Sequence, residues 1–161
     1  MNTFEDIYTD NYKAMHRVAI KMVGNIDEVP DIVQEIFIDF FNKTTNGNII
    51  HNPKNWLYKA TINKCIDKLR KREKFQSIES LAGIKSEEVT IECQELKAAM
   101  DLAISKLKPH EKILAVFYSE GLSYKELAEV TGIKYSSIGK VISRTLRKIE
   151  KELRNQHYEL Y

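Results

Sequence analysis

The sequence has few cysteines, prolines and glycines, and it has no long apolar segment. Its 161 residues include two cysteines, three prolines and six glycines. Cys65 and Cys93 form no C-x-x-C pair, so nothing indicates a disulfide framework and a reducing compartment is expected. No apolar run approaches the ~20 residues that cross a bilayer, and the acidic start (Glu5, Asp6, Asp10) is unlike a signal peptide. We therefore expect a cytoplasmic protein without membrane insertion.

Motifs for catalysis and for metal binding are also missing. The sequence contains no phosphate loop, no nucleophile elbow and no H-x-x-x-C-x-x-C zinc spacing. Its four histidines are scattered, as ordinary surface or half-buried histidines are: His16, His51, His110 and His157. The sequence therefore predicts no enzyme, no cofactor and no metal site.

Charge is present in blocks that alternate in sign along the chain. Residues 1–49 carry a net charge of −4, residues 50–76 carry +6, residues 77–101 carry −4 and residues 102–161 carry +4. Two basic blocks between acidic ones are typical of a chain that contacts a polyanion at two places and offers acidic surfaces to another partner. Solvated helix faces on which charges cluster by chance would give the same net charges. The charge pattern alone therefore does not show that the chain binds a polyanion.

Apolar residues recur at helical spacing, and no stretch alternates with the period of two that marks a strand. Three amphipathic segments are predicted in the first half, the third of them beginning near Pro53, which suits a first helical turn. Their apolar residues are Tyr8, Met15, Val18, Met22 and Val23, then Ile32, Val33, Ile36, Phe37, Phe40 and Phe41, then Trp56, Leu57, Ala60, Cys65, Ile66 and Leu69. We expect an all-α protein.

Apolar residues become sparse between Gln76 and Cys93, where Ser, Glu and Gly accumulate. We interpret this stretch as part of a linker, which gives an N-terminal domain (1–74), a linker (75–96) and a C-terminal domain (97–161). One compact domain with an internal loop is the less favoured alternative, because structureless loops longer than ~12–15 residues are uncommon in such domains.

The C-terminal domain contains the most specific pattern. After a helix that begins near Pro109, Glu120-Gly121 supplies a stop, and Ser123-Tyr124-Lys125-Glu126 fits a capping box. Gly132 follows where a left-handed residue would turn the chain. The next predicted helix has one apolar side and, opposite to it, a cationic side. The apolar side is formed by Ile138, Ile142, Leu146, Ile149 and Leu153. This order predicts a helix-turn-helix that binds DNA through its second helix, with a solvated surface helix as the alternative.

The stretch Leu107–Leu153 resembles the C-terminal DNA-binding domain of bacterial sigma factors, especially the extracytoplasmic-function (ECF) group of the sigma-70 family. The shared pattern is L-x-P, an apolar helix, E-G, S-x-x-E-[IL]-A, G-[IV] and a helix ending in S-R-x-L-x-K. Two motifs in the first half narrow the choice among regulators. Asp31–Phe37 is similar to the D-L-x-Q-E-x-F segment of sigma factors, and Trp56–Arg70 resembles their W-L-x-x-I-x-x-N-x-x-x-D-x-x-R helix.

The resemblance implies an RNA polymerase sigma factor, which binds core polymerase and directs promoter-specific initiation. In the family, the D-L-x-Q-E-x-F helix docks on the clamp helices of the polymerase β′ subunit. Here this implies polymerase binding by Asp31, Gln34, Glu35 and Phe37, although Phe37 also lies in an apolar stripe and core packing is its competing interpretation. The implied partners are core RNA polymerase through its β′ clamp helices and β subunit, promoter DNA, and an anti-sigma factor.

The same resemblance implies the DNA contacts. The −10 element would be bound by Asn63, Lys64, Lys68 and Lys71, with the loop 44–52 bordering a pocket for one unstacked base. The −35 element would be bound by Ser136, Ser137, Lys140, Ser143, Arg144 and Lys148. We interpret Trp56 as a core residue rather than a platform for base stacking, because tryptophans of amphipathic helices usually pack.

The sequence departs from the family pattern at several positions. Pro30 replaces a usual acidic residue and predicts that a helix begins there. Lys134 stands at the usual Ser/Asp cap of the recognition helix, which weakens that cap by ~1 kcal/mol. Gly139 and Val141 lie where basic residues are frequent, so −35 readout rests on fewer cations. Two alternatives stay open: a stand-alone helix-turn-helix regulator that does not engage polymerase, and an adaptor that holds a protein partner through its N-terminal helices.

Overall fold

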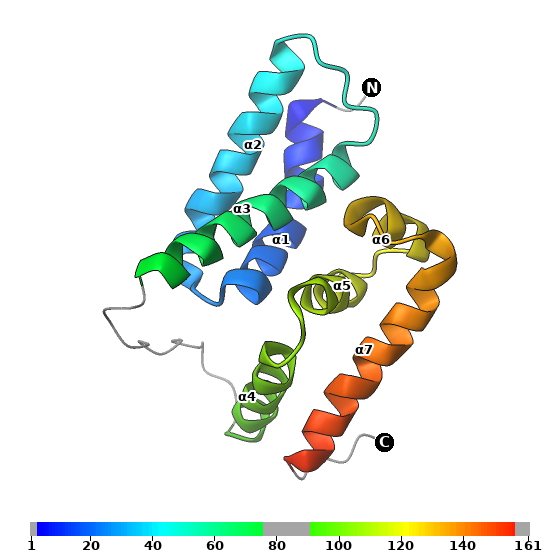
Figure 1. Cartoon of the computed structure of the whole chain (residues 1–161). Coiled ribbons are helices and arrows are strands. Elements are labelled where there is room, and N and C mark those ends of the chain that lie inside the picture. The colour runs from blue at the N-terminus through cyan, green and yellow to red at the C-terminus, as the bar shows by residue number, and fades with distance from the viewer. Residues whose placement is uncertain (1–2, 76–90, 157–161) are drawn as a thin grey trace. The chain divides into compact units, whose positions relative to one another are not determined.

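The computed structural model describes residues 3–75 and 91–156, which belong to two compact units (Figure 1). Unit 1 is Met1–Ile84 and unit 2 is Lys85–Tyr161. Every regular element in the described ranges is helical, which confirms the predicted all-α fold with two helical domains. Within these ranges no helix combines the length and the apolar composition that a membrane span requires.

The boundary between the units falls inside the segment 75–96 that the sequence predicts as a linker. Helix α4 begins at Ile91, so the last six residues of that segment are helical. Residues 76–90 of the predicted linker lie outside the described residues.

The described residues of unit 1 form three long helices and one short turn of 3-10 helix. They are α1 (Phe4–Val23), η1 (Ile26–Glu28), α2 (Val29–Thr45) and α3 (Pro53–Phe75). Each of the three long helices packs against the other two. The apolar stripes predicted from the sequence meet in the middle, where the side chains of Met15, Ile36, Phe40 and Leu57 are at most 2% exposed.

Local signals in the sequence set the helix ends of unit 1. Thr3 and Asp6 form a capping box at the start of α1, and Gly24 ends that helix with a φ of 71°, a conformation that favours glycine. Pro30 lies in the first turn of α2, as predicted. The side chain of Asn52 accepts a hydrogen bond from the backbone N–H of Asn55 and so caps α3. These caps fix where α2 and α3 present their surfaces.

Residues 91–156, the described part of unit 2, form four helices, and the longest packs against the other three. They are α4 (Ile91–Ser105), α5 (Pro109–Ser119), α6 (Tyr124–Thr131) and α7 (Tyr135–Asn155). The predicted capping box of Ser123 and Glu126 begins α6, and Gly132 ends it with a φ of 76°. Helices α6 and α7 form the helix-turn-helix that the sequence predicts.

Some residues predicted as core are exposed. Leu146 is 42% exposed, and Thr145 beside it is 1% exposed, so Thr145 takes the inward position on α7. Thr145 and Leu146 lie at opposite edges of the apolar face of α7, and the packing of unit 2 buries the Thr145 edge. Tyr8 and Phe41 in unit 1 are 40% and 49% exposed. They line a surface pocket instead of the core.

Candidate functional site

Helix α2 exposes polar residues that the sequence assigns to polymerase binding. Asp31, Gln34 and Glu35 are exposed, and their spacing of three and four residues places them on one face of the helix. We call these three residues the acidic patch. Phe37 is only 3% exposed, so its side chain belongs to the core beneath this surface.

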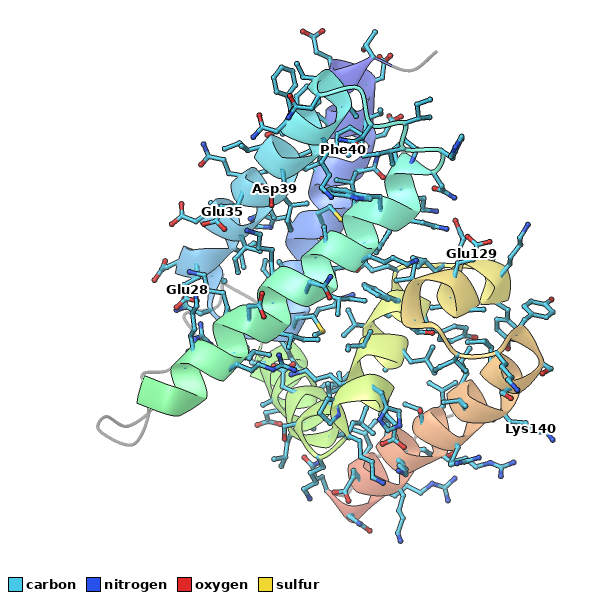
Figure 2. The ribbon with its side chains drawn as sticks, turned by 45° about the horizontal axis from the view of Figure 1, so that its top comes forward. Glu28, Glu35, Asp39, Phe40, Glu129 and Lys140 are labelled. Carbon is cyan, nitrogen blue, oxygen red and sulfur yellow. The ribbon has the colours of Figure 1, made fainter. Side chains whose placement is uncertain are left out.

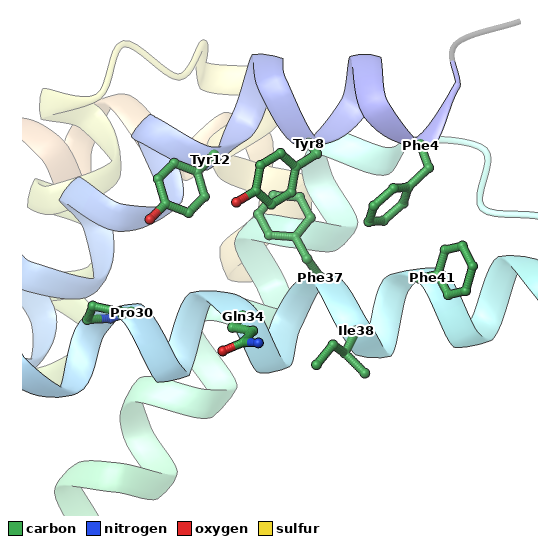
Figure 3. Close-up of a pocket in the computed structure, with 8 residues that line it drawn as sticks. All are labelled: Phe4, Tyr8, Tyr12, Pro30, Gln34, Phe37, Ile38 and Phe41. Carbon is green, nitrogen blue, oxygen red and sulfur yellow. The ribbon is translucent and has the colours of Figure 1, made fainter.

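An aromatic pocket of about 600 Å³ opens between α1 and α2 beside the acidic patch (Figure 3). It is lined by Phe4, Tyr8, Tyr12, Pro30, Gln34, Phe37, Ile38 and Phe41. The ring centroids of Tyr8 and Phe37 lie 4.7 Å apart, and Ile38 and Phe41 each leave 49% of their surface exposed. Gln34 belongs to both features, so the pocket and the patch form one continuous surface. The sequence analysis did not predict this pocket. The signal that could have indicated it is that the apolar residues of α2 cover more of the helix than one buried face requires.

Helix α3 places a lysine against the acidic patch. Nζ of Lys64 lies 3.0 Å from Oε2 of Glu35 and 3.5 Å from Oδ2 of Asp39, two α2 residues that are labelled in Figure 2. The hydrogen bond from Lys64 lowers the pKa of Glu35, and the same bond raises the pKa of Lys64. A residue predicted to bind −10 DNA and a residue predicted to bind polymerase thus form an ion pair between the two helices.

The other predicted −10 residues also lie on α3. Lys64, Lys68 and Lys71 are spaced by four and three residues, so they share one face, and the charge of each helps to lower the pKa of Glu35. Asn63 is exposed and lies about 100° round the helix from Lys64. The structure therefore gathers the three lysines beside α2 and leaves Asn63 on the adjoining face.

The loop between α2 and α3 is residues 46–52, slightly shorter than predicted, because α2 continues through Thr45. Its most exposed apolar side chain is Ile49, at 79%. Trp56 is half-buried, with its ring centroid 5.5 Å from that of Phe40 and 5.7 Å from Nζ of Lys43. These contacts favour packing as the role of Trp56.

The predicted −35 residues lie along α7. Ser137 is half-buried, and the others are exposed: Ser136, Lys140, Ser143, Arg144 and Lys148. Figure 2 shows Lys140 extending away from the helix. Lys134 stands at the N-cap of α7 without a side-chain hydrogen bond to the helix, in agreement with the weak cap expected there. The recognition helix thus offers a polar and basic surface over about three turns.

Lys148 is also held by unit 2 itself. Its Nζ lies 2.6 Å from Oε1 of Glu111, and Oε2 of Glu111 accepts a hydrogen bond from the backbone N–H of Lys108. Glu111 is 5% exposed and is the one charged residue that is buried in the described part of the chain. The hydrogen bond from Lys148 lowers the pKa of Glu111, whereas burial acts in the opposite direction.

The structure also bears on metal binding and on the thiol of unit 1. Among the described residues, no three His, Cys, Asp or Glu side chains are placed to hold one metal ion. Burial raises the pKa of the Cys65 thiol to about 12, so it stays protonated near neutral pH.

These surfaces define a class of protein. Unit 2 is a helix-turn-helix with a polar and basic second helix, which is the architecture of a DNA-binding domain. Unit 1 combines an acidic patch and an apolar pocket with a basic helix face. A chain of this class binds nucleic acid and has a separate surface for a protein.

Comparison with known proteins finds similarity to sigma factors. Residues 7–75 match the family model of sigma-70 region 2. The chain is 26% identical to the ECF RNA polymerase sigma factor SigW of Bacillus subtilis over 166 residues, which covers 93% of this chain and 87% of SigW. It is 29% identical to the RNA polymerase sigma factor SigV of the same organism over 153 residues, covering 90% and 87%.

A solved structure has the same fold. The sigma factor RpoE of Bartonella quintana, crystallised with the anti-sigma factor NepR, superimposes with a TM-score of 0.72 at 22% identity, covering 94% of this chain and 96% of RpoE. Over most of its length the chain is thus similar to RNA polymerase sigma factors, among them an ECF sigma factor, and residues 7–75 match sigma-70 region 2.

Proposed function

We propose that this chain is an RNA polymerase sigma factor that binds core polymerase and directs transcription initiation at specific promoters. The observation that carries the proposal is the presence, within unit 1, of the acidic patch and aromatic pocket beside the basic face of α3. A stand-alone helix-turn-helix regulator needs neither surface, because unit 2 alone would suffice to bind duplex DNA.

Helix α2 is the proposed contact with the clamp helices of the polymerase β′ subunit. The acidic patch offers two carboxylates and one amide to a basic partner helix. The aromatic pocket beside Gln34 offers an apolar site for a side chain of the same helix, and such pockets often carry most of the binding energy. Phe37 contributes from beneath, by supporting the ring of Tyr8 in the pocket wall. The β subunit is the proposed second contact on polymerase, because the chain resembles sigma factors in both of its domains.

Helix α3 is the proposed contact with the −10 element. Lys64, Lys68 and Lys71 form a row of positive charge that can follow the phosphates of a DNA strand. Asn63, on the adjoining face, has an amide that can bond to a base edge. Loop 46–52 precedes this helix and is proposed to border the pocket for an unstacked base.

Helix α7 is the proposed contact with the −35 element. Lys140 and Arg144 are four residues apart and project from one face. Ser136, Ser137 and Ser143 add short donors and acceptors that suit base edges and phosphates. Lys148 lies farther along the helix, where a phosphate contact fits better than base readout.

The proposed function also implies a further protein partner and a cellular compartment. RpoE of Bartonella quintana was crystallised with an anti-sigma factor, and we propose that an anti-sigma factor also binds this chain. We propose that the chain acts in the cytoplasm, where polymerase and promoter DNA are found, and that it has no catalytic activity of its own.

Transcription in vitro with purified core polymerase and a library of promoter fragments tests the function. The wild-type chain should produce transcripts from promoters that share −35 and −10 elements, and core polymerase without it should not. Asp31→Lys alters the acidic patch without touching the Lys64 ion pair and should weaken core binding several-fold. Asp10→Lys, on an exposed position of α1, is the matched control. Tight binding of the free chain to promoter duplex, with no transcription when core is added, would favour the stand-alone regulator.

A further inference from the structure

The recognition helix begins with an exposed aromatic ring. Tyr135 is the first residue of α7, and 65% of its surface is exposed, more than for any other aromatic residue in the described ranges. In a docked helix-turn-helix, residues at the start of the second helix contact base edges in the major groove. Tyr135 therefore occupies a position from which a side chain reads sequence.

The half-buried Gly139 is covered by a second tyrosine. It follows Tyr135 by four residues and so lies one turn along the same face of α7. A Cβ placed on Gly139 would lie 3.5 Å from Cε2 of Tyr124, whose ring therefore covers this part of the helix from α6. Tyr124 is the first residue of α6 and is 43% exposed. Tyr124 and Tyr135 thus begin the two helices of the helix-turn-helix, and both side chains are exposed.

We propose that Tyr135 is a specificity-determining residue of this chain, which contacts the methyl group of a thymine in the −35 element. The inference rests on the proposed sigma function and assigns base readout to a residue outside the serines and cations of α7. An apolar contact distinguishes thymine from the other bases, because only thymine carries a methyl group in the major groove. The hydroxyl of Tyr124, across Gly139, donates to a phosphate and fixes the register.

Substitution of deoxyuridine for thymidine in the promoter provides a direct test. It removes the methyl group and leaves the hydrogen-bonding edge of the base unchanged. The test uses the full chain with core polymerase on the −35 element that the wild type selects, with each thymidine replaced in turn. At one position the wild type should lose roughly fourfold in promoter affinity, the effect of one buried methyl group. Tyr135→Ala should show no further loss on that substitution, and Tyr135→Phe should keep the wild-type response.

Matched variants separate readout from anchoring and from folding. Tyr124→Phe should weaken all promoters alike and keep the response to deoxyuridine. Tyr118→Ala, on a 40% exposed tyrosine of α5 in the same unit, should change neither. The inference is overturned if Tyr135→Ala retains the wild-type response to deoxyuridine, or if the selected −35 element contains no thymine on either strand. A wild-type chain that supports no promoter-dependent transcription would instead overturn the proposed function.

Discussion

Nζ of Lys148 lies 2.6 Å from Oε1 of Glu111, and this ion pair ties the recognition helix α7 to the start of α5. Glu111 is buried, and its second carboxylate oxygen is bonded to the backbone N–H of Lys108. The ammonium of Lys148 has two further donors, and 45% of its side chain is exposed, which leaves it within reach of a phosphate. Lys148 thus combines a structural contact within unit 2 with its proposed contact to DNA.

Lys148→Ala should lower the free energy of unfolding by roughly 1–3 kcal/mol, because it leaves the Glu111 carboxylate buried without its charged partner. Urea denaturation of the full chain, followed by circular dichroism, measures this change. Lys151→Ala, on an exposed position of the same helix, is the control and should stay within about 0.5 kcal/mol of the wild type. Equal effects of the two substitutions would show that the ion pair contributes nothing.

Glu111 should also make the stability depend on pH. The hydrogen bond from Lys148 lowers the pKa of Glu111 from its usual value of 4.5, so folding favours the charged carboxylate. The stability from this group is complete above the unfolded-state pKa and is lost as the pH falls through the lower folded-state pKa. The difference in unfolding free energy between wild type and Glu111→Gln should be constant between about pH 6 and 8 and should shrink below ~4.5. A difference that grows on acidification would contradict the assignment.

Glu35→Gln should weaken binding to core polymerase several-fold, whereas Asp39→Asn should leave it nearly unchanged. Both substitutions remove a carboxylate that lies near Lys64, but only Glu35 belongs to the acidic patch. These ion pairs are exposed and worth less than ~1 kcal/mol, so both variants should melt near the wild-type temperature. A sharp fall in melting temperature that accompanies the polymerase defect would assign Glu35 to the structure instead.

Lys140→Ala should cost roughly 1–3 kcal/mol at the preferred −35 sequence and relax the preference there, because Lys140 lies near the start of α7 where base edges are within reach. Lys148→Ala should weaken all promoters alike and reduce the salt slope of DNA binding by about one. Promoter-library transcription with each variant measures both effects. An equal loss at every promoter for Lys140→Ala would make Lys140 a phosphate anchor and leave readout to Ser136, Ser137, Ser143 or Arg144.

Cys65 should resist thiol reagents in the folded chain. Its side chain is fully buried, and its pKa of about 12 keeps the thiolate, the reactive form, scarce. In a Cys93→Ser background, iodoacetamide should label Cys65 many-fold more slowly in the folded chain than in the urea-unfolded chain, because labelling requires the buried thiol to become exposed. Fast labelling in the absence of denaturant would show that α3 opens locally.

Much of the fold could be predicted because its signals are local. The helical spacing of apolar residues predicts the long helices, and the capping box of Ser123 together with Gly132 predicts the bounds of α6. The prediction that Leu146 is a core residue is wrong. The spacing of apolar residues defines a helix face but does not say which residue at the edge of that face is buried. Thr145 turns inward there, as the burial of its side chain shows.

The site was less predictable, because its contacts depend on how helices pack. The row of Asp31, Gln34 and Glu35 follows from spacing along one helix. The ion pair of Glu35 with Lys64 joins residues 29 positions apart, and no pattern in the sequence fixes that distance. The aromatic pocket likewise requires α1 to lie across α2, so that Tyr8 meets Phe37. The residues that share one face of a helix can be predicted from the sequence, whereas the contacts between two helices cannot.

Helix α7 is one continuous helix of 21 residues, about 30 Å long, and its two ends have different surroundings. Tyr135 begins it on the exposed surface, whereas Ile149 and Leu153 near its end pack against Ala99 and Ala103 of α4. A tilt of about 5° at the α4 end would displace the other end by roughly 2–3 Å, and α5 and α6, which also pack against α7, would have to adjust to it. We therefore expect substitutions in the α4 contact to affect promoter choice, although α4 lies outside the proposed DNA surface.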